Sequence, residues 1–144
     1  GRDIARTRDW KTRKSLWEST ARIGPYSPRV HNNLGDVYGL EQNWDKAIYH
    51  FELSIKLKPD FYYAMHNLAN TYLKMGDLDN AEPWLKKSLE LRPDLYQSIH
   101  KLGLIEYNRG NIEEAKALFN KTLEYDPNYL PAIEALQILQ QRNL

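Results

Sequence analysis

The chain has 144 residues, 42% of them hydrophobic and 27% charged, which is the composition of one soluble domain of modest size. Its 20 Lys and Arg nearly balance its 19 Asp and Glu, so we do not expect a nucleic-acid-binding protein, because such domains carry a marked basic excess. The absence of cysteine excludes disulfides and thiolate metal ligands, and no apolar run reaches the length of a membrane span.

A unit of 34 residues occurs three times without a gap, at residues 28–61, 62–95 and 96–129. The copies share apolar, small and proline positions, among them Leu34, Leu68 and Leu102; Ala47, Ala81 and Ala115; and Pro59, Pro93 and Pro127. A fixed period of this length predicts one continuous all-α domain of stacked helix pairs, a class in which function lies on the surfaces of the stack.

The N-terminal segment, residues 1–27, precedes the regular copies. Residues 10–25 match the second half of the unit, with Trp17 at the position of Leu85, but Arg13 stands where the later copies have a close-packed alanine. We therefore expect a degenerate half-repeat helix here. Residues 1–25 contain seven basic and three acidic residues, a net charge of +4. A segment of this sign suits a solvated helix end, anionic lipid or an acidic partner.

Each complete copy is expected to form two antiparallel helices. In the first copy, apolar residues three and four positions apart predict a helix over about residues 28–41. Asn43 and Asp45 then supply a turn and a cap for the second helix, and Pro59 closes the unit. In the second copy Gly76–Asp77 has the same role, with glycine ending one helix and aspartate capping the next.

Three further positions stand out in chain order. Proline is tolerated at the first position of a helix, but Pro83 lies beyond that position. A distorted first turn is therefore expected in this helix. Glu106 replaces Tyr38 and Tyr72 of the earlier copies, so its carboxylate is expected to be exposed or to pair with Arg109 or Lys74. After the third copy, residues 130–144 align with a first helix alone. An amphipathic helix at this place is expected to cap the apolar end of the stack.

The three copies resemble the tetratricopeptide repeat family over about residues 28–143. The residues that carry the resemblance in the first copy are Leu34–Gly35, Tyr38, Ala47, Phe51, Ser54 and Pro59, and the later copies follow the same pattern. The resemblance implies a right-handed superhelix in which the first helices line a concave groove. It also implies a non-catalytic scaffold that binds a protein or an extended peptide.

The resemblance places a set of mostly polar side chains in the groove: Asn33, Tyr63, His66, Asn67, Asn70, Lys74, His100, Lys101 and Asn108. Asn33 and Asn67 occupy equivalent positions in successive copies, and stacked asparagines can hydrogen-bond the backbone of an extended peptide whatever its side chains are. Alternatively, asparagine is simply common on such surfaces.

Some members of the family bind the C-terminal carboxylates of a chaperone through a Lys, Asn, Asn, Lys, Arg set. In our alignment the corresponding residues are Asn32, Asp36, Asn67, Gln97 and Lys101, of which only Asn67 matches. Because Asp36 would repel a carboxylate, this activity is not expected.

His66 and His100 are one period apart, but two histidines flanked by Asn and Lys are a poor metal site, so a groove contact is the better expectation. No nucleophile, base and orienting group stand at a recognisable spacing, and there is no phosphate-binding glycine loop. We therefore expect neither a metal nor a cofactor, and no enzyme activity in this chain.

The junction from Asp9 to Gly35 resembles the segment that joins the last membrane span to the repeats in transmembrane-and-tetratricopeptide proteins of the O-mannosylation type. The matching residues are Trp10, Lys11, Leu16, Trp17 and Pro25. This resemblance implies an alternative function, in which the chain is the soluble C-terminal region of a membrane-embedded glycosyltransferase-like protein and positions acceptor proteins or assembles a complex. Membrane attachment and catalysis would then lie upstream of Gly1. In the simpler account, Trp10 and Trp17 are core aromatics of a half-repeat.

Overall fold

The computed structural model describes residues 9–23 and 27–144, and within these ranges the chain forms eight α-helices and no strand. The helices are α2 (Asp9–Ile23), α3 (Pro28–Leu40), α4 (Trp44–Leu57), α5 (Tyr62–Lys74), α6 (Leu78–Leu91), α7 (Tyr96–Asn108), α8 (Ile112–Tyr125) and α9 (Leu130–Gln141). The predicted all-α solenoid is thereby confirmed. Expectations that concern residues 1–8 and 24–26 lie outside the described part.

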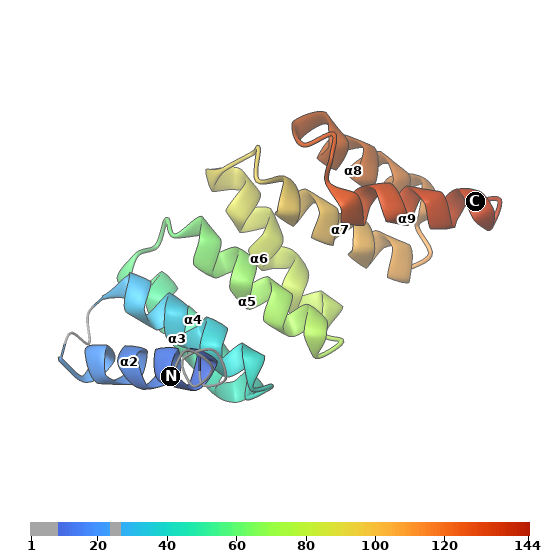
Figure 1. Cartoon of the computed structure of the whole chain (residues 1–144). Helices are drawn as coiled ribbons and strands as arrows, with labels where there is room; N and C mark the ends of the chain where they lie inside the picture. The colour runs from blue at the N-terminus through green and yellow to red at the C-terminus, as the bar shows by residue number, and fades with distance from the viewer. Residues whose placement is uncertain (1–8, 24–26) are drawn as a thin grey trace.

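The helices stack in chain order, with α2 and α9 at opposite ends (Figure 1). Within the copies α3 packs on α4, α5 on α6 and α7 on α8, and the copies are joined by α4 against α5 and α6 against α7. At the ends, α2 packs on α3 and α9 packs on α8. Each helix therefore contacts mainly its neighbours along the chain, as expected for a solenoid.

Side-chain caps begin the helices where the sequence predicts them. Asn43 accepts from the backbone N–H of Lys46 at the start of α4, and Asp77 accepts from that of Asn80 at 3.2 Å at the start of α6. Gly76 has a φ of +80°, the left-handed conformation that glycine adopts most easily. Helix α6 continues without interruption through Pro83, where the sequence predicts a distorted first turn.

The core of each copy lies where its two helices cross, and it pairs a small residue with a large one. Gly35 of α3 faces the ring of Phe51 on α4, and a Cβ at Gly35 would lie 2.6 Å from Phe51 Cε1. Gly103 faces Phe119 in the same way, whereas the middle copy packs Ala69 against Leu85. The close approach of the helices thus depends on the size of both partners.

An ion-pair cluster on the surface joins the second and third copies. Arg109 contacts Glu106 of its own copy at 3.3 Å, and it reaches back to Asp79 at 3.1 Å and to Glu82 of α6. Asn111 also donates to Glu106, at 2.7 Å. The expected pairing of Glu106 with Arg109 is therefore present, and Lys74 takes no part in it.

The two ends of the stack are covered differently. At the start, Trp17 of α2 packs against the core of the first copy, and Lys14 pairs with Glu41 at 2.8 Å. At the other end, α9 buries Ala132 and Leu139 and leaves Leu130 and Ile138 exposed. One face of α9 thus covers the last core.

Candidate binding groove

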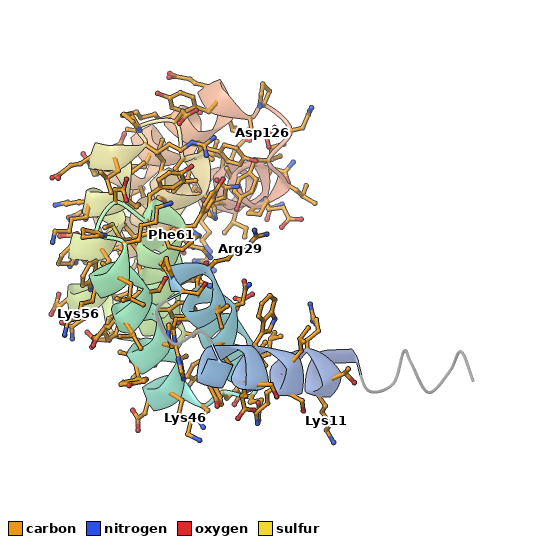
Figure 2. All side chains as sticks on the ribbon, turned by 90° about the vertical axis from the view of Figure 1, so that its left-hand side faces the viewer. Lys11, Arg29, Lys46, Lys56, Phe61 and Asp126 are labelled. Carbon is orange, nitrogen blue, oxygen red and sulfur yellow. The ribbon has the colours of Figure 1, made fainter. Side chains whose placement is uncertain are left out.

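The curved stack has an open side, and Arg29 on α3 points into it, whereas Lys56 on α4 lies on the outer side (Figure 2). Three hollows lie between successive first helices, each lined mainly by two neighbours. Their chemistry changes along the stack from amides through lysines to apolar side chains. We name them the amide hollow, the lysine hollow and the apolar hollow.

The amide hollow, about 540 Å³, lies mainly between α3 and α5. It is lined by Pro28, Arg29, Asn32, Asn33, Lys58, Phe61, Tyr63 and Asn67. Within it, Asn67 Nδ2 donates a hydrogen bond to Asn32 Oδ1 at 3.0 Å. In the described structure Asn67 Oδ1 and Asn32 Nδ2 have no hydrogen-bond partner, so the linked pair offers one acceptor and one donor.

The sequence predicted Asn33 and Asn67 as the equivalent pair, and both line the amide hollow. The structure instead joins Asn67 to Asn32, the residue next to its equivalent. Residues one period apart occupy the same place on their own helices, and the stagger between neighbouring helices decides which side chains meet. The repeat alignment compares equivalent positions only, so it does not show the hydrogen bond between Asn32 and Asn67.

His66 is held by a short chain of hydrogen bonds. Its Nδ1 lies 2.9 Å from Ser98 Oγ, Ser98 Oγ lies 3.0 Å from Ser88 Oγ, and Ser88 donates to the carbonyl of Leu85 at 2.7 Å. Because the proton of Ser88 is used on that carbonyl, Ser98 donates to Ser88 and Nδ1–H of His66 donates to Ser98. His66 Nε2 is then left as an acceptor.

Burial, followed by the positive charge of Lys101, lowers the pKa of His66 to about 4, so the ring is neutral near pH 7. Ser98 is fully buried, so this His–Ser pair does not present an accessible nucleophile and base. The pair fixes the orientation of the His66 ring.

His100 differs from the prediction of a groove contact, because its side chain is only 4% exposed. The ring packs against Phe119 and Tyr129, with 5.3 Å between ring centroids in each case. Burial and the charge of Lys101 lower the pKa of His100 to about 4. Among the residues with described positions, no group of three His, Asp or Glu side chains is arranged to hold a metal ion.

The lysine hollow, about 390 Å³, lies mainly between α5 and α7. It is lined by Asn70, Leu73, Lys74, Gly76, Leu78, Lys101, Leu104 and Asn108. Lys101 is half-buried, and burial together with the charge of Lys74 lowers its pKa below the usual value. No acidic residue is among the lining residues, so two cations share a hollow without a counter-charge.

The apolar hollow, about 290 Å³, lies between α7, α8 and α9. It is lined by Leu104, Tyr107, Phe119, Ala135, Ile138 and Arg142. Arg142 donates to the hydroxyl of Tyr107, which joins α9 to α7 beside the hollow. Leu104 lines both this hollow and the lysine hollow, so the two are neighbours. The apolar hollow was not predicted from the sequence.

The remaining predicted residues have mixed roles. Tyr63 is 45% exposed and lines the amide hollow, but its hydroxyl also accepts from Arg92 Nη1 at 3.0 Å. Asn108 Nδ2 donates to the carbonyl of Leu104 at 2.8 Å, within its own helix. Asn70 and Lys74 line the lysine hollow, and among the described residues neither side chain hydrogen-bonds to its own helix.

Helix pairs repeated every 34 residues, with hollows between their first helices, define the chain as an α-solenoid repeat protein. It belongs to the tetratricopeptide repeat family, whose sequence profiles match residues 28–61 and 61–128. No curated protein sequence matches the chain.

Several solved structures share this fold. The first tetratricopeptide repeat domain of Spaghetti (RPAP3), bound to the HSP90 peptide SRMEEVD, has a TM-score of 0.76 at 22% identity, over 81% of this chain and 92% of that one. The Arabidopsis OM64 domain has a TM-score of 0.77 at 21% identity, over 81% and 96%. MamA has a TM-score of 0.76 at 20% identity, over 90% and 72%. At these identities the likeness establishes the fold.

None of the helices in the described ranges is both long and apolar enough to cross a membrane.

Proposed function

We propose that the chain is a non-catalytic scaffold whose concave face binds an extended peptide segment of a partner protein. The observation that carries the proposal is the hydrogen-bonded pair Asn32 and Asn67 in the amide hollow. The open acceptor on Asn67 and the open donor on Asn32 complement the N–H and C=O of a peptide backbone. Such contacts depend on the backbone and leave sequence selectivity to other parts of the groove.

A similar domain is bound to an HSP90 peptide, which supports a peptide as the class of ligand.

The test uses a random dodecapeptide library displayed on phage and selected on the purified chain. Selected peptides are expected to bind Asn67→Ala about tenfold more weakly, since a lost amide contact and an unpaired partner cost about 1.4 kcal/mol together. Asn120→Ala is the matched control, because Asn120 is exposed on α8, the second helix of its copy. Equal binding to the wild type and Asn67→Ala would refute the role of the amide hollow.

A second candidate function is recognition of a peptide that ends in a free carboxylate. Of the carboxylate-binding set Asn32, Asp36, Asn67, Gln97 and Lys101, only Asn32 and Asn67 line the amide hollow. Arg29, which is outside that set, lines the same hollow and supplies a guanidinium there. A guanidinium together with amide N–H groups can hold a carboxylate.

This candidate is tested with the peptide SRMEEVD, which is bound in the similar domain, and with the same peptide amidated at its C-terminus. Recognition of the terminal carboxylate predicts that the free acid binds and that amidation or Arg29→Gln weakens binding at least about tenfold, as expected for a lost charge contact. Equal binding of the two peptides would exclude this function and leave backbone recognition in place.

The alternative in which the chain is the soluble part of a glycosyltransferase-like membrane protein rests on the junction Asp9–Gly35. The coding sequence upstream of Gly1 tests it directly. Several apolar spans there would support the transferase, and further repeats would support the free scaffold.

A further inference from the structure

The lysine hollow and the apolar hollow are neighbours of unlike chemistry. Leu104 on α7 lines both of them. A ligand that runs along the concave face past α7 therefore meets two cations and an apolar pocket side by side. These two hollows can select the side chains of the ligand, whereas the amide hollow contacts only its backbone.

The lysine hollow lacks the partner that its charges require. In the described part of the chain neither Lys74 nor Lys101 forms an ion pair or a hydrogen bond, and the hollow is lined otherwise by Asn70, Asn108 and apolar residues. Lys101 is half-buried, and a buried ammonium without a counter-charge is unfavourable. Its lowered pKa, caused by burial and by Lys74, agrees with this. A carboxylate between the two lysines would supply the missing counter-charge and offset the repulsion between the two ammonium groups.

The apolar hollow is suited to a single large side chain. Its walls are Leu104, Tyr107, Phe119, Ala135 and Ile138, with Arg142 as the one charged lining residue. Ile138 is 45% exposed, so apolar surface stays open to solvent here. Filling such a pocket removes apolar surface from water, and anchors of this kind supply much of the binding energy of interfaces.

We propose that the ligand of this groove carries an acidic side chain close in sequence to a large apolar one, with the carboxylate between Lys74 and Lys101 and the apolar side chain in the apolar hollow. This inference rests on the proposed function, since it concerns a peptide bound along the same face. An extended chain advances roughly 3.3 Å per residue, and hollows that share a wall are neighbours, so we expect the two side chains within about four residues of each other.

The dodecapeptide selection tests the inference when its peptides are fused to the phage through their C-termini, so that an acidic group in a selected peptide is a side chain. The wild-type pool is expected to be enriched in Asp or Glu within about four residues of Leu, Ile, Met or Phe, as the length of extended chain requires. Selection on the Lys74→Gln, Lys101→Gln double variant is expected to lose the acidic residue and to keep the apolar one. Selection on Ile138→Gln, a change at an exposed position, is expected to keep the acidic residue and to lose the apolar one.

A selected peptide is then measured in solution by fluorescence polarisation. The double lysine variant should weaken binding at least about tenfold, as expected when a partly buried charge contact is lost. Lys121→Gln, at an exposed position on α8, is the matched control and should leave binding unchanged. Circular dichroism verifies that each variant is folded.

The outcomes separate the two proposals. If selected peptides depend on Asn67 but contain no paired acidic and apolar residues, or bind the double lysine variant as tightly as the wild type, this inference is overturned and the proposed function stands. If no peptide shows binding that depends on Asn67, both fail.

Discussion

Gly35→Ala is expected to destabilise the protein, although alanine is the better helix former. A Cβ at this position would lie 2.6 Å from Cε1 and 2.7 Å from Cδ1 of Phe51. Phe51 is only 2% exposed, so its ring has no open space to move into. The substitution therefore forces the two helices of the first copy apart or the ring out of its place.

The expected magnitude follows from two opposing effects. Overpacking a close-packed core costs about 1–3 kcal/mol. Replacing glycine by alanine inside a helix is favourable by about 0.5–1 kcal/mol. At Gly39 in the same helix, a Cβ would meet no atom within 4 Å, so Gly39→Ala reports the helix effect alone. The difference between the two variants is then the packing cost, about 1–3 kcal/mol.

The middle copy shows which second change should restore stability. It has Ala69 and Leu85 where the first copy has Gly35 and Phe51, so Phe51→Leu in the Gly35→Ala background rebuilds a natural pair. The two substitutions are expected to be coupled, with a favourable interaction energy of about 0.5–3 kcal/mol, the range seen for residues in contact.

Urea denaturation of the four proteins in this mutant cycle, with Gly39→Ala alongside, measures these quantities. If Gly35→Ala is as stable as Gly39→Ala, the helices are not packed as closely as described. If the cycle is additive, the pairing of glycine with phenylalanine is not what fixes their approach.

Three further predictions concern the core, the caps and pH. Ala81 is fully buried, so Ala81→Trp should lower the free energy of unfolding by about 1–3 kcal/mol, and an unchanged melting temperature would contradict its position at the crossing of α5 and α6. Asp77→Ala removes the cap of α6 and should cost about 1 kcal/mol in the same measurement, whereas a neutral effect would show that this cap is dispensable. Because burial lowers the pKa of His66 and His100 to about 4, the unfolded chain takes up protons first, and stability should fall between about pH 6.5 and 4. His66→Gln should make this fall shallower, and an identical pH profile would refute the assignment.

Much of the fold could be predicted because each copy repeats the same local signals. The expected first helix, residues 28–41, is observed as Pro28–Leu40, and the second begins directly after its cap at Asn43. These ends are fixed by neighbouring residues in the chain, so a single sequence contains the information. The sequence also shows the residues that pair at each helix crossing, where a small residue faces a large one: glycine with phenylalanine, or alanine with leucine.

The site was less predictable, because equivalent residues have different neighbours. His66 and His100 occupy the same position, yet His100 packs against Phe119 and Tyr129, while the residues one period before these are Leu85 and Leu95. The aromatic rings help to bury His100. His66, beside Ser98, keeps a partly exposed ring. Such differences arise between copies, and a pattern averaged over the repeat does not show them.

The lysine hollow shows the same limitation. Lys74 and Lys101 belong to different copies and different positions of the unit, and only the folded arrangement brings them to the lining of one hollow. Repeat alignment identified each as a groove residue and gave no reason to pair them.

The most direct test of the central claim is an NMR titration of the isotopically labelled chain with a selected peptide, following the side-chain amide signals of asparagine. We predict that the signals of Asn32 and Asn67 shift on binding, while that of Asn120 on α8 stays in place. Shifts confined to Asn120 and its neighbours on the second helices, with Asn32 and Asn67 unchanged, would contradict the account.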